Sequence, residues 1–173
     1  MKTLRLLMFE ECQRKCEGCC NNDWDLSKLP IVESYQNFDM IVLTGGEPML
    51  APRFLVETCA AIRKETEAPI ILYTAKSKRV VDLLAVLHWV DGVTLTLHEQ
   101  YDVFGFLAFN KLYQILPYRK SMRLNVFSNV DLSGVNTDGW DVHAGMKWIK
   151  NCPLPENEVF MRLNAPGGYY DSR

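Results

Sequence analysis

The sequence lacks a long hydrophobic run, and it lacks an excess of charge of either sign. No apolar stretch among its 173 residues approaches the ~20 residues of a membrane-spanning helix, so we expect no membrane span and no membrane partner. The 19 Lys and Arg residues nearly balance the 21 Asp and Glu residues, which gives a formal net charge of −2. Since no global basic field attracts phosphate groups, we expect no nucleic-acid partner.

Low-complexity tracts, internal repeats and linker-like segments are also lacking. The length falls within the roughly 100 to 200 residues of one domain, so we expect residues 1–173 to form a single domain. The N-terminal segment has a basic start but no small-residue cleavage site, and it runs into Glu10 and Glu11. It matches a secretory signal poorly, so we expect a cytoplasmic protein.

Six short apolar runs, each ending near polar residues, Gly or Pro, predict mostly buried strands. They cover 4–9, 40–43, 70–73, 93–97, 122–127 and 159–163. Helical spacing predicts helices at about 52–64, 77–87 and 102–116, with weaker signals at 30–37 and 139–150. This alternation predicts an α/β fold with a parallel sheet, either a partial barrel or an open doubly wound sheet. In both, ligands bind at the carboxyl ends of the strands.

Cysteines are concentrated directly after the first predicted strand. Cys12, Cys16 and Cys19 have the spacing C-x3-C-x2-C, and Cys20 follows at once. Thiolates select zinc, copper(I) or iron–sulfur clusters. Three thiolates leave one iron of a [4Fe-4S] cluster open, whereas structural zinc normally takes four ligands, and adjacent thiolates suit one tetrahedral ion poorly. The alternative is a set of inert or adventitiously reactive thiols; a disulfide is not expected in a cytosolic protein.

A second motif, Gly45-Gly46-Glu47-Pro48, follows the second predicted strand. Two glycines at a strand end let the backbone approach a ligand closely. Their exposed amides and carbonyls would suit the polar end of an amino acid.

With C-x3-C-x2-C after strand one and Gly-Gly-Glu-Pro after strand two, the sequence resembles the radical S-adenosylmethionine superfamily. The resemblance implies a partial (β/α)6 TIM-like barrel and two cofactors, a [4Fe-4S] cluster and S-adenosylmethionine. The implied cluster ligands are Cys12, Cys16 and Cys19. The open iron would bind the amino and carboxylate groups of S-adenosylmethionine, and the methionine amino group would be lined by Gly45, Gly46 and Glu47.

The implied chemistry is carried by the cofactors. One electron entering the cluster would split S-adenosylmethionine into methionine and a 5′-deoxyadenosyl radical, which abstracts a substrate hydrogen. The protein would position the reactants and exclude water. We therefore expect no catalytic side chain beyond the cluster and S-adenosylmethionine.

Within the superfamily, residues 16–24 follow the pattern C-x-G-C-x-N-x-x-W and look most like the activases of glycyl-radical enzymes, especially that of anaerobic ribonucleotide reductase. Thr74, at the end of strand three, is similar to a threonine found there in activases. The implied partners are a glycyl-radical enzyme and a flavodoxin-like electron donor. Only 11 residues precede the first cysteine, and 96–98 reads Thr-Leu-His where some activases have Asp-x-Lys.

Two other functions stay open. One is a small-molecule enzyme resembling 7-carboxy-7-deazaguanine synthase, for which residues 164–171 would form a lid or else a flexible tail. The other is a zinc- or cluster-binding module without turnover.

Several further residues are candidates with a structural alternative. His98 is a candidate for contacting the cofactor or transferring a proton, against a surface histidine. Asn125, Ser128 and Asn164 are candidates for contacting ribose or adenine. Arg14 and Lys15 would raise the cluster potential or dock an acidic donor, against a role as solvated charges. Trp24 and Trp140 would cover the site or lie in the core, and Cys59 and Cys152 are expected to be structural thiols.

Overall fold

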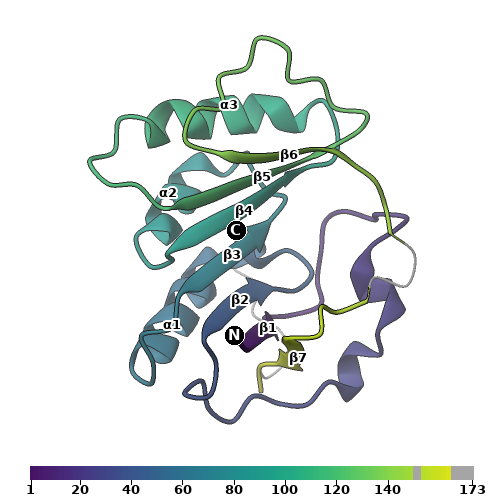
Figure 1. Cartoon of the computed structure of the whole chain (residues 1–173), viewed down its shortest axis with the longest axis vertical. Coiled ribbons are helices and arrows are strands. Elements are labelled where there is room, and N and C mark those ends of the chain that lie inside the picture. Colours follow the sequence, from purple (N-terminus) through teal and green to yellow (C-terminus); the bar gives the residue numbers. More distant parts are fainter. Residues whose placement is uncertain (150–152, 165–173) are drawn as a thin grey trace.

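Seven parallel strands form a single sheet in the computed structural model, which describes residues 1–149 and 153–164 (Figure 1). The strands are β1 (Thr3–Leu7), β2 (Met40–Thr44), β3 (Ile70–Thr74), β4 (Gly92–Leu97), β5 (Ser121–Phe127), β6 (Asp141–Met146) and β7 (Glu158–Arg162). Their order is β6-β5-β4-β3-β2-β1-β7. The predicted α/β fold with a parallel sheet is confirmed.

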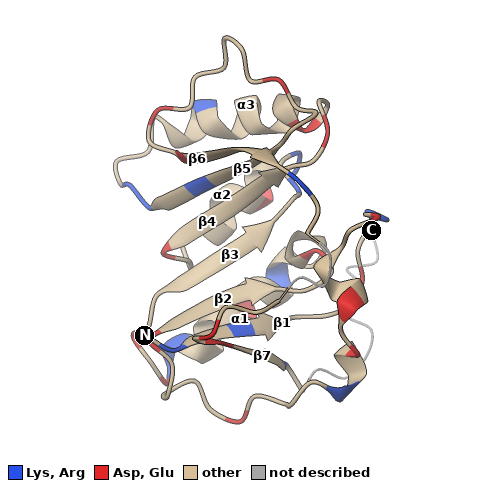
Figure 2. Cartoon of the chain, turned by 45° about the vertical axis from the view of Figure 1, so that its right-hand side comes forward, with Lys and Arg blue, Asp and Glu red and all other residues tan. Residues whose placement is uncertain are grey.

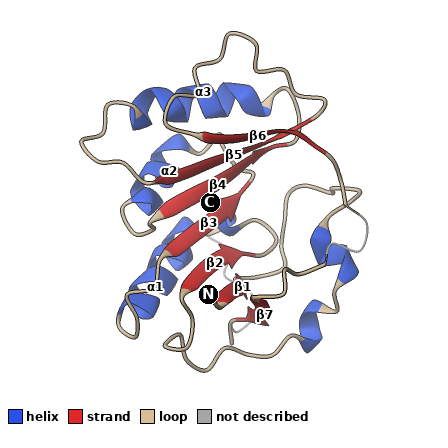
Figure 3. Cartoon of the chain, viewed as in Figure 1, coloured by secondary structure: helices blue, strands red, loops and turns tan. Residues whose placement is uncertain are grey.

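Three helices connect strands β2 to β5 and pack next to one another in chain order (Figures 1 and 3). They are α1 (Pro52–Arg63), α2 (Val80–Leu87) and α3 (Asp102–Tyr113). Because side chains alternate across a strand, one face of the sheet is apolar, and its residues join those of all three helices in one core. All three helices therefore cover the same face.

The opposite face carries a different set of side chains. Near β1 and β7, Leu7, Leu29 and Phe160 form a small apolar cluster. Trp24, Leu26 and Leu154 pack against it. Elsewhere on this face half-buried polar residues predominate, among them Arg5, Thr44, Tyr73, Thr96, Arg123 and Asn125. Lys and Arg residues are scattered among Asp and Glu residues over the ribbon (Figure 2).

The six predicted strands are all present, and so are the helices near 52–64, 77–87 and 102–116. The weak helical predictions at 30–37 and 139–150 are wrong. In the first, Val32 donates to the Arg162 carbonyl and Arg162 to the Pro30 carbonyl, so the chain runs extended beside β7. The second is β6, an exposed strand whose pairing with β5 is irregular near Gly145, where φ is +73°. Its mostly solvated side chains gave no buried-strand signal.

The last predicted strand, β7, lies beside β1 rather than continuing the series after β5. The described pairings leave β6 and β7 as the two edges of an open sheet. No helix within 1–149 or 153–164 has both the length and the apolar character needed to cross a membrane.

Candidate functional site

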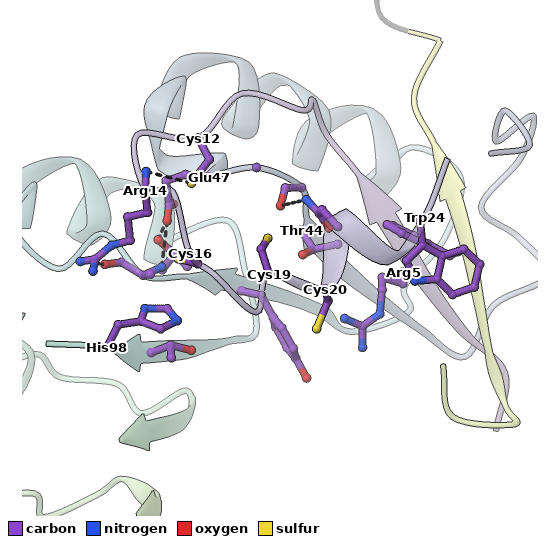
Figure 4. Close-up of a pocket in the computed structure, with 18 of the residues that line it drawn as sticks. Arg5, Cys12, Arg14, Cys16, Cys19, Cys20, Trp24, Thr44, Glu47 and His98 are labelled. Atoms are coloured by element: carbon purple, nitrogen blue, oxygen red, sulfur yellow. Dashed lines mark hydrogen bonds between the residues drawn. The ribbon is translucent and has the colours of Figure 1, made fainter. Parts of the chain in front are cut away.

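The thiol loop, residues 8–19 after β1, lies over the carboxyl ends of the neighbouring strands (Figure 4). Cys12, Cys16 and Cys19 line a cavity of about 240 Å³. Residues at the ends of β2, β3 and β4 complete its wall, among them Thr44, Gly45, Gly46, Glu47, Thr74 and His98. The structure thus brings the cysteine motif and the glycine-rich turn to one cavity, at the sheet edge where ligands were expected.

The three thiols influence one another electrostatically. Burial raises the pKa of Cys12 and of Cys16, and neighbouring negative charge, including that of a Cys19 thiolate, raises both further, whereas Arg14 lowers them. All three thiols are free. A bound metal would oppose this effect at Cys12 and Cys16, because its positive charge favours the thiolate form of its ligands.

The spacing of these thiols is wide. Among the residues that the structure describes, no three His, Cys, Asp or Glu side chains converge closely enough for one metal ion. Cys20 is not a fourth free thiol, because it is disulfide-bonded, contrary to the expectation of no disulfide. The thiols frame a cavity instead of a compact tetrahedral site.

The glycine-rich turn is fastened to the thiol loop by backbone hydrogen bonds. The Gly46 amide donates to the Phe9 carbonyl at 2.8 Å, and the Glu47 amide donates to the Glu11 carbonyl at 2.9 Å. A Cβ on Gly46 would lie 1.9 Å from the Glu11 oxygen. The Gly46 amide is therefore not exposed as expected, and the glycine at position 46 is required by the chain's own packing.

A second tie joins the same turn to the end of the cysteine motif. The Asn21 side chain donates to the Gly45 carbonyl at 2.9 Å. Gly45 itself has a φ of +146°, and an added Cβ would lie 2.6 Å from the Phe9 oxygen. The two sequence motifs are thus one structural unit, held together before any ligand binds.

Glu47 is buried and fully engaged. Its carboxylate accepts hydrogen bonds from the Thr74 hydroxyl at 2.6 Å, the Ala75 amide at 2.9 Å and the Met49 amide at 3.0 Å. Burial raises the pKa of Glu47, and these hydrogen bonds act in the opposite direction. Glu47 and Thr74, both predicted as site residues, therefore anchor the turn to β3 while lining the cavity.

Arg14 is not a solvated charge. It forms an ion pair with Asp102, whose side chain is 1% exposed, and it also donates to the Ala75 carbonyl at 3.3 Å. Asp102 accepts further hydrogen bonds from the His98 and Glu99 amides at 3.0 and 3.1 Å. The pair fixes the thiol loop to the ends of β3 and β4. Sequence reasoning identified Asp102 only as the start of a helix, because its partner is 88 residues away.

His98 lies on the cavity wall, next to Trp148. The two rings stack with centroids 5.1 Å apart and planes 13° apart, and His98 also contacts Phe127. Its Nδ1 is buried without a hydrogen-bond partner among the described residues. Burial, together with the positive charge of Arg14, lowers the pKa of His98 to about 4. The ring is therefore neutral near pH 7 and lines the cavity, while its unpaired Nδ1 is buried.

Trp148 was missed from the sequence, because it follows a solvated strand and belongs to no periodic pattern. Its side chain packs against Gly18 in the thiol loop, where an added Cβ would lie 2.5 Å from the Trp148 Cβ. A second cavity, of about 580 Å³, adjoins the first and shares with it Arg14, Cys16, His98 and Trp148. Phe127, Ser128 and Asn129 complete much of its wall.

Other predicted residues are dispersed. Asn125 lines neither cavity, and its side-chain oxygen accepts from Arg123 at 3.2 Å. Trp140 lies in the core beside α3, whereas Trp24 lines the first cavity. Asn164 is exposed.

Of the two remaining cysteines, the structure describes only Cys59. Cys59 is a buried core thiol as predicted, and burial raises its pKa to about 12. Cys152 and the predicted lid beyond residue 164 lie outside the described residues.

Comparison of the chain with protein-family models, with curated proteins and with solved structures finds no significant match.

Proposed function

We propose that this chain is a radical S-adenosylmethionine enzyme that uses a [4Fe-4S] cluster to generate a 5′-deoxyadenosyl radical. One observation carries the proposal. Three free thiols at C-x3-C-x2-C spacing and a Gly-Gly-Glu turn line one cavity at the carboxyl edge of a parallel sheet. A partial barrel, in which the polar sheet face lines the interior, is part of this proposal.

The residues present fit the cluster. Cys12, Cys16 and Cys19 supply three thiolates spread around a cavity, and the disulfide at Cys20 removes the nearest competing sulfur. Three ligands leave one iron of a cubane open to a chelating ligand. When bound, the cluster supplies the electron that splits S-adenosylmethionine into methionine and the 5′-deoxyadenosyl radical.

The chain's own residues bind and orient the second cofactor. The methionine ammonium group is a hydrogen-bond donor, and Gly45 and Gly46 line the cavity; the Gly45 carbonyl, which accepts from Asn21, has a second lone pair to offer. His98 is neutral, so it lines the cavity without adding charge. The stacked rings of His98 and Trp148, with Phe127 tilted against both, form an aromatic boundary shared by the two cavities, suited to the adenosine moiety and to water exclusion.

For the substrate, we propose a glycine of a glycyl-radical enzyme, in a cytoplasmic setting. The support is the sequence similarity at residues 16–24 and the exposure of Cys12, which leaves the thiol loop accessible to a protein partner. A small-molecule substrate, as for enzymes resembling 7-carboxy-7-deazaguanine synthase, is the second candidate. The adjoining cavity of about 580 Å³ favours it, because that volume lies in the range of small-molecule sites.

Anaerobic reconstitution with iron and sulfide tests the proposal. We expect about four irons per chain and formation of 5′-deoxyadenosine from S-adenosylmethionine under reduction. Cys16→Ala is expected to abolish the product, whereas Cys59→Ala, in the core, is the matched thiol control and should retain it. Product formation by Cys16→Ala, or none by the wild-type chain with its iron bound, would overturn the proposal.

A further inference from the structure

A third cavity lies on the outer side of the thiol loop, between that loop and the segments that follow β3 and β4. Its volume is about 220 Å³. Residues from three segments form its wall: Cys12, Gln13 and Arg14; Ala75, Lys76, Ser77 and Lys78; and Tyr101 and Asp102. Glu47 also lines it. The cavity shares Cys12, Arg14, Glu47 and Ala75 with the main cavity, whereas Lys76 and Lys78 line only this one.

The wall of this cavity carries more cationic than anionic side chains: Arg14, Lys76 and Lys78 against Glu47 and Asp102. Neither Lys76 nor Lys78 forms an ion pair within the described part of the chain. Lys76 donates instead to the Gln13 side chain at 3.0 Å, and the Lys78 ammonium lies 4.3 Å from the centre of the Tyr101 ring.

Of the two carboxylates on the wall, Asp102 is paired with Arg14. Glu47 is held by Thr74 and two backbone amides, and it interacts electrostatically with Lys76 without forming an ion pair. The acidic residues Glu10, Glu11 and Glu17 of the adjacent loop do not line the cavity. The wall therefore keeps an excess of positive charge, carried by the two ammonium groups, to attract an external anionic group.

The two lysines lie where an electron donor could reach the proposed cluster. Cys12 is the one exposed thiol of the three, and it lies on the wall of this cavity as well as the main one. A protein docked here would approach the cluster edge at Cys12, through a cavity whose wall does not include Cys16, Cys19 or His98. Since the chain carries a net charge of −2, the two lysines form a local patch suited to carboxylates of a folded partner, not a broad surface for a polyphosphate.

We propose that Lys76 and Lys78 form the docking surface for an acidic protein that carries one electron at a time. The inference rests on the proposed function and names the electron-supplying partner of the same site. Carboxylates of the reduced donor pair with the two ammonium groups, and one electron passes to the cluster at its Cys12 edge. The donor is oxidised by one electron for each electron that the cluster gains.

The test compares the double variant Lys76→Glu/Lys78→Glu with a matched control, Lys64→Glu/Lys111→Glu. The control reverses two exposed charges at the C-terminal ends of α1 and α3. Affinity of each reconstituted chain for purified flavodoxin is measured by calorimetry at low and high ionic strength. We expect affinity to fall roughly tenfold or more at low salt for the first variant and less than about twofold for the control. The difference should shrink at high salt.

A second readout separates docking from chemistry. Reduction of the cluster is followed by absorbance with flavodoxin and with reduced methyl viologen, a small cationic reductant. The first variant should slow reduction by flavodoxin and leave reduction by viologen within about twofold of the wild type. Lys78→Gln, at an exposed position, should give a smaller loss in the same direction and is the variant to use if the double substitution does not fold.

Outcomes distinguish the two proposals. Equal affinity of the two double variants, no flavodoxin binding by the wild type, or an equal loss with viologen would overturn the docking surface. Displacement of flavodoxin by dilute inorganic phosphate at constant ionic strength would also overturn it, since the lysines would then form a phosphate site. Failure to form 5′-deoxyadenosine with viologen would instead count against the proposed function, and the affinity measurement would still decide the docking surface.

Discussion

Breaking the ion pair between Arg14 and Asp102 is the perturbation with the clearest expected magnitude. Asp102 is 1% exposed and Arg14 is 20% exposed, so removing the guanidinium leaves a buried carboxylate without its countercharge. Such a loss costs about 3 to 5 kcal/mol of unfolding free energy. The backbone amides of His98 and Glu99 still donate to Asp102, so we expect Arg14→Gln to lie near the lower end, at about 3 kcal/mol.

Urea unfolding at neutral pH measures this loss. With a slope of about 2 kcal/mol per molar urea, the midpoint should fall by about 1.5 M for Arg14→Gln. A double-mutant cycle with Asp102→Asn should give a coupling energy of about 1 to 3 kcal/mol. Arg53→Gln is the control, because its pair with Glu57 joins side chains that are 86% and 56% exposed, and it should cost less than about 0.5 kcal/mol. If Arg14→Gln costs no more than the control, or the coupling is below about 0.5 kcal/mol, the pair does not hold the thiol loop.

Three further predictions follow from the same site. Gly46→Ala should destabilise the chain by more than about 2 kcal/mol in urea unfolding, because its Cβ would lie 1.9 Å from the Glu11 oxygen; a midpoint near the wild type's would contradict the tie between the motifs. The pKa of His98 is lowered to about 4 in the folded state, so its contribution to stability is complete above its ordinary value near 6.5 and is lost as pH falls toward 4. Allowing for partial solvent exposure, the wild type should lose about 1 kcal/mol more than His98→Gln between pH 7 and pH 5, and equal losses would show that the ring is not buried neutral. Trp148→Ala should leave iron content unchanged but weaken S-adenosylmethionine binding roughly tenfold in calorimetry, since it removes one face of the ring stack at His98; unchanged affinity would place the adenosine elsewhere.

Local signals explain why much of the fold could be predicted. The buried strands β1 to β5 and β7 are short apolar runs, and buried parallel strands have that composition. Helices α1, α2 and α3 bury one stripe each, which gives helical spacing. Strand β6 could not be recognised, because an exposed edge strand with a bulge near Gly145 has neither an apolar run nor strict alternation.

The site, too, contains residues that could be predicted from local sequence and residues that could not. Contiguous motifs at Cys12–Cys19 and Gly45–Glu47 could be read directly, and parallel topology explains why they meet. Pairings across long sequence distances could not, and they include Arg14 with Asp102 and Trp148 with Gly18. The role of the Gly46 amide was also predicted incorrectly, because only the folded chain shows that the Phe9 carbonyl occupies it.

The central claim is that Cys12, Cys16 and Cys19 hold a cluster with one iron left open for S-adenosylmethionine. Electron paramagnetic resonance of the anaerobically reconstituted, reduced chain tests it most directly. We expect a signal of a reduced [4Fe-4S] cluster whose shape changes when S-adenosylmethionine is added, because the added molecule becomes the fourth ligand. A cluster signal that S-adenosylmethionine leaves unchanged, at a concentration where calorimetry shows it bound, would contradict the account.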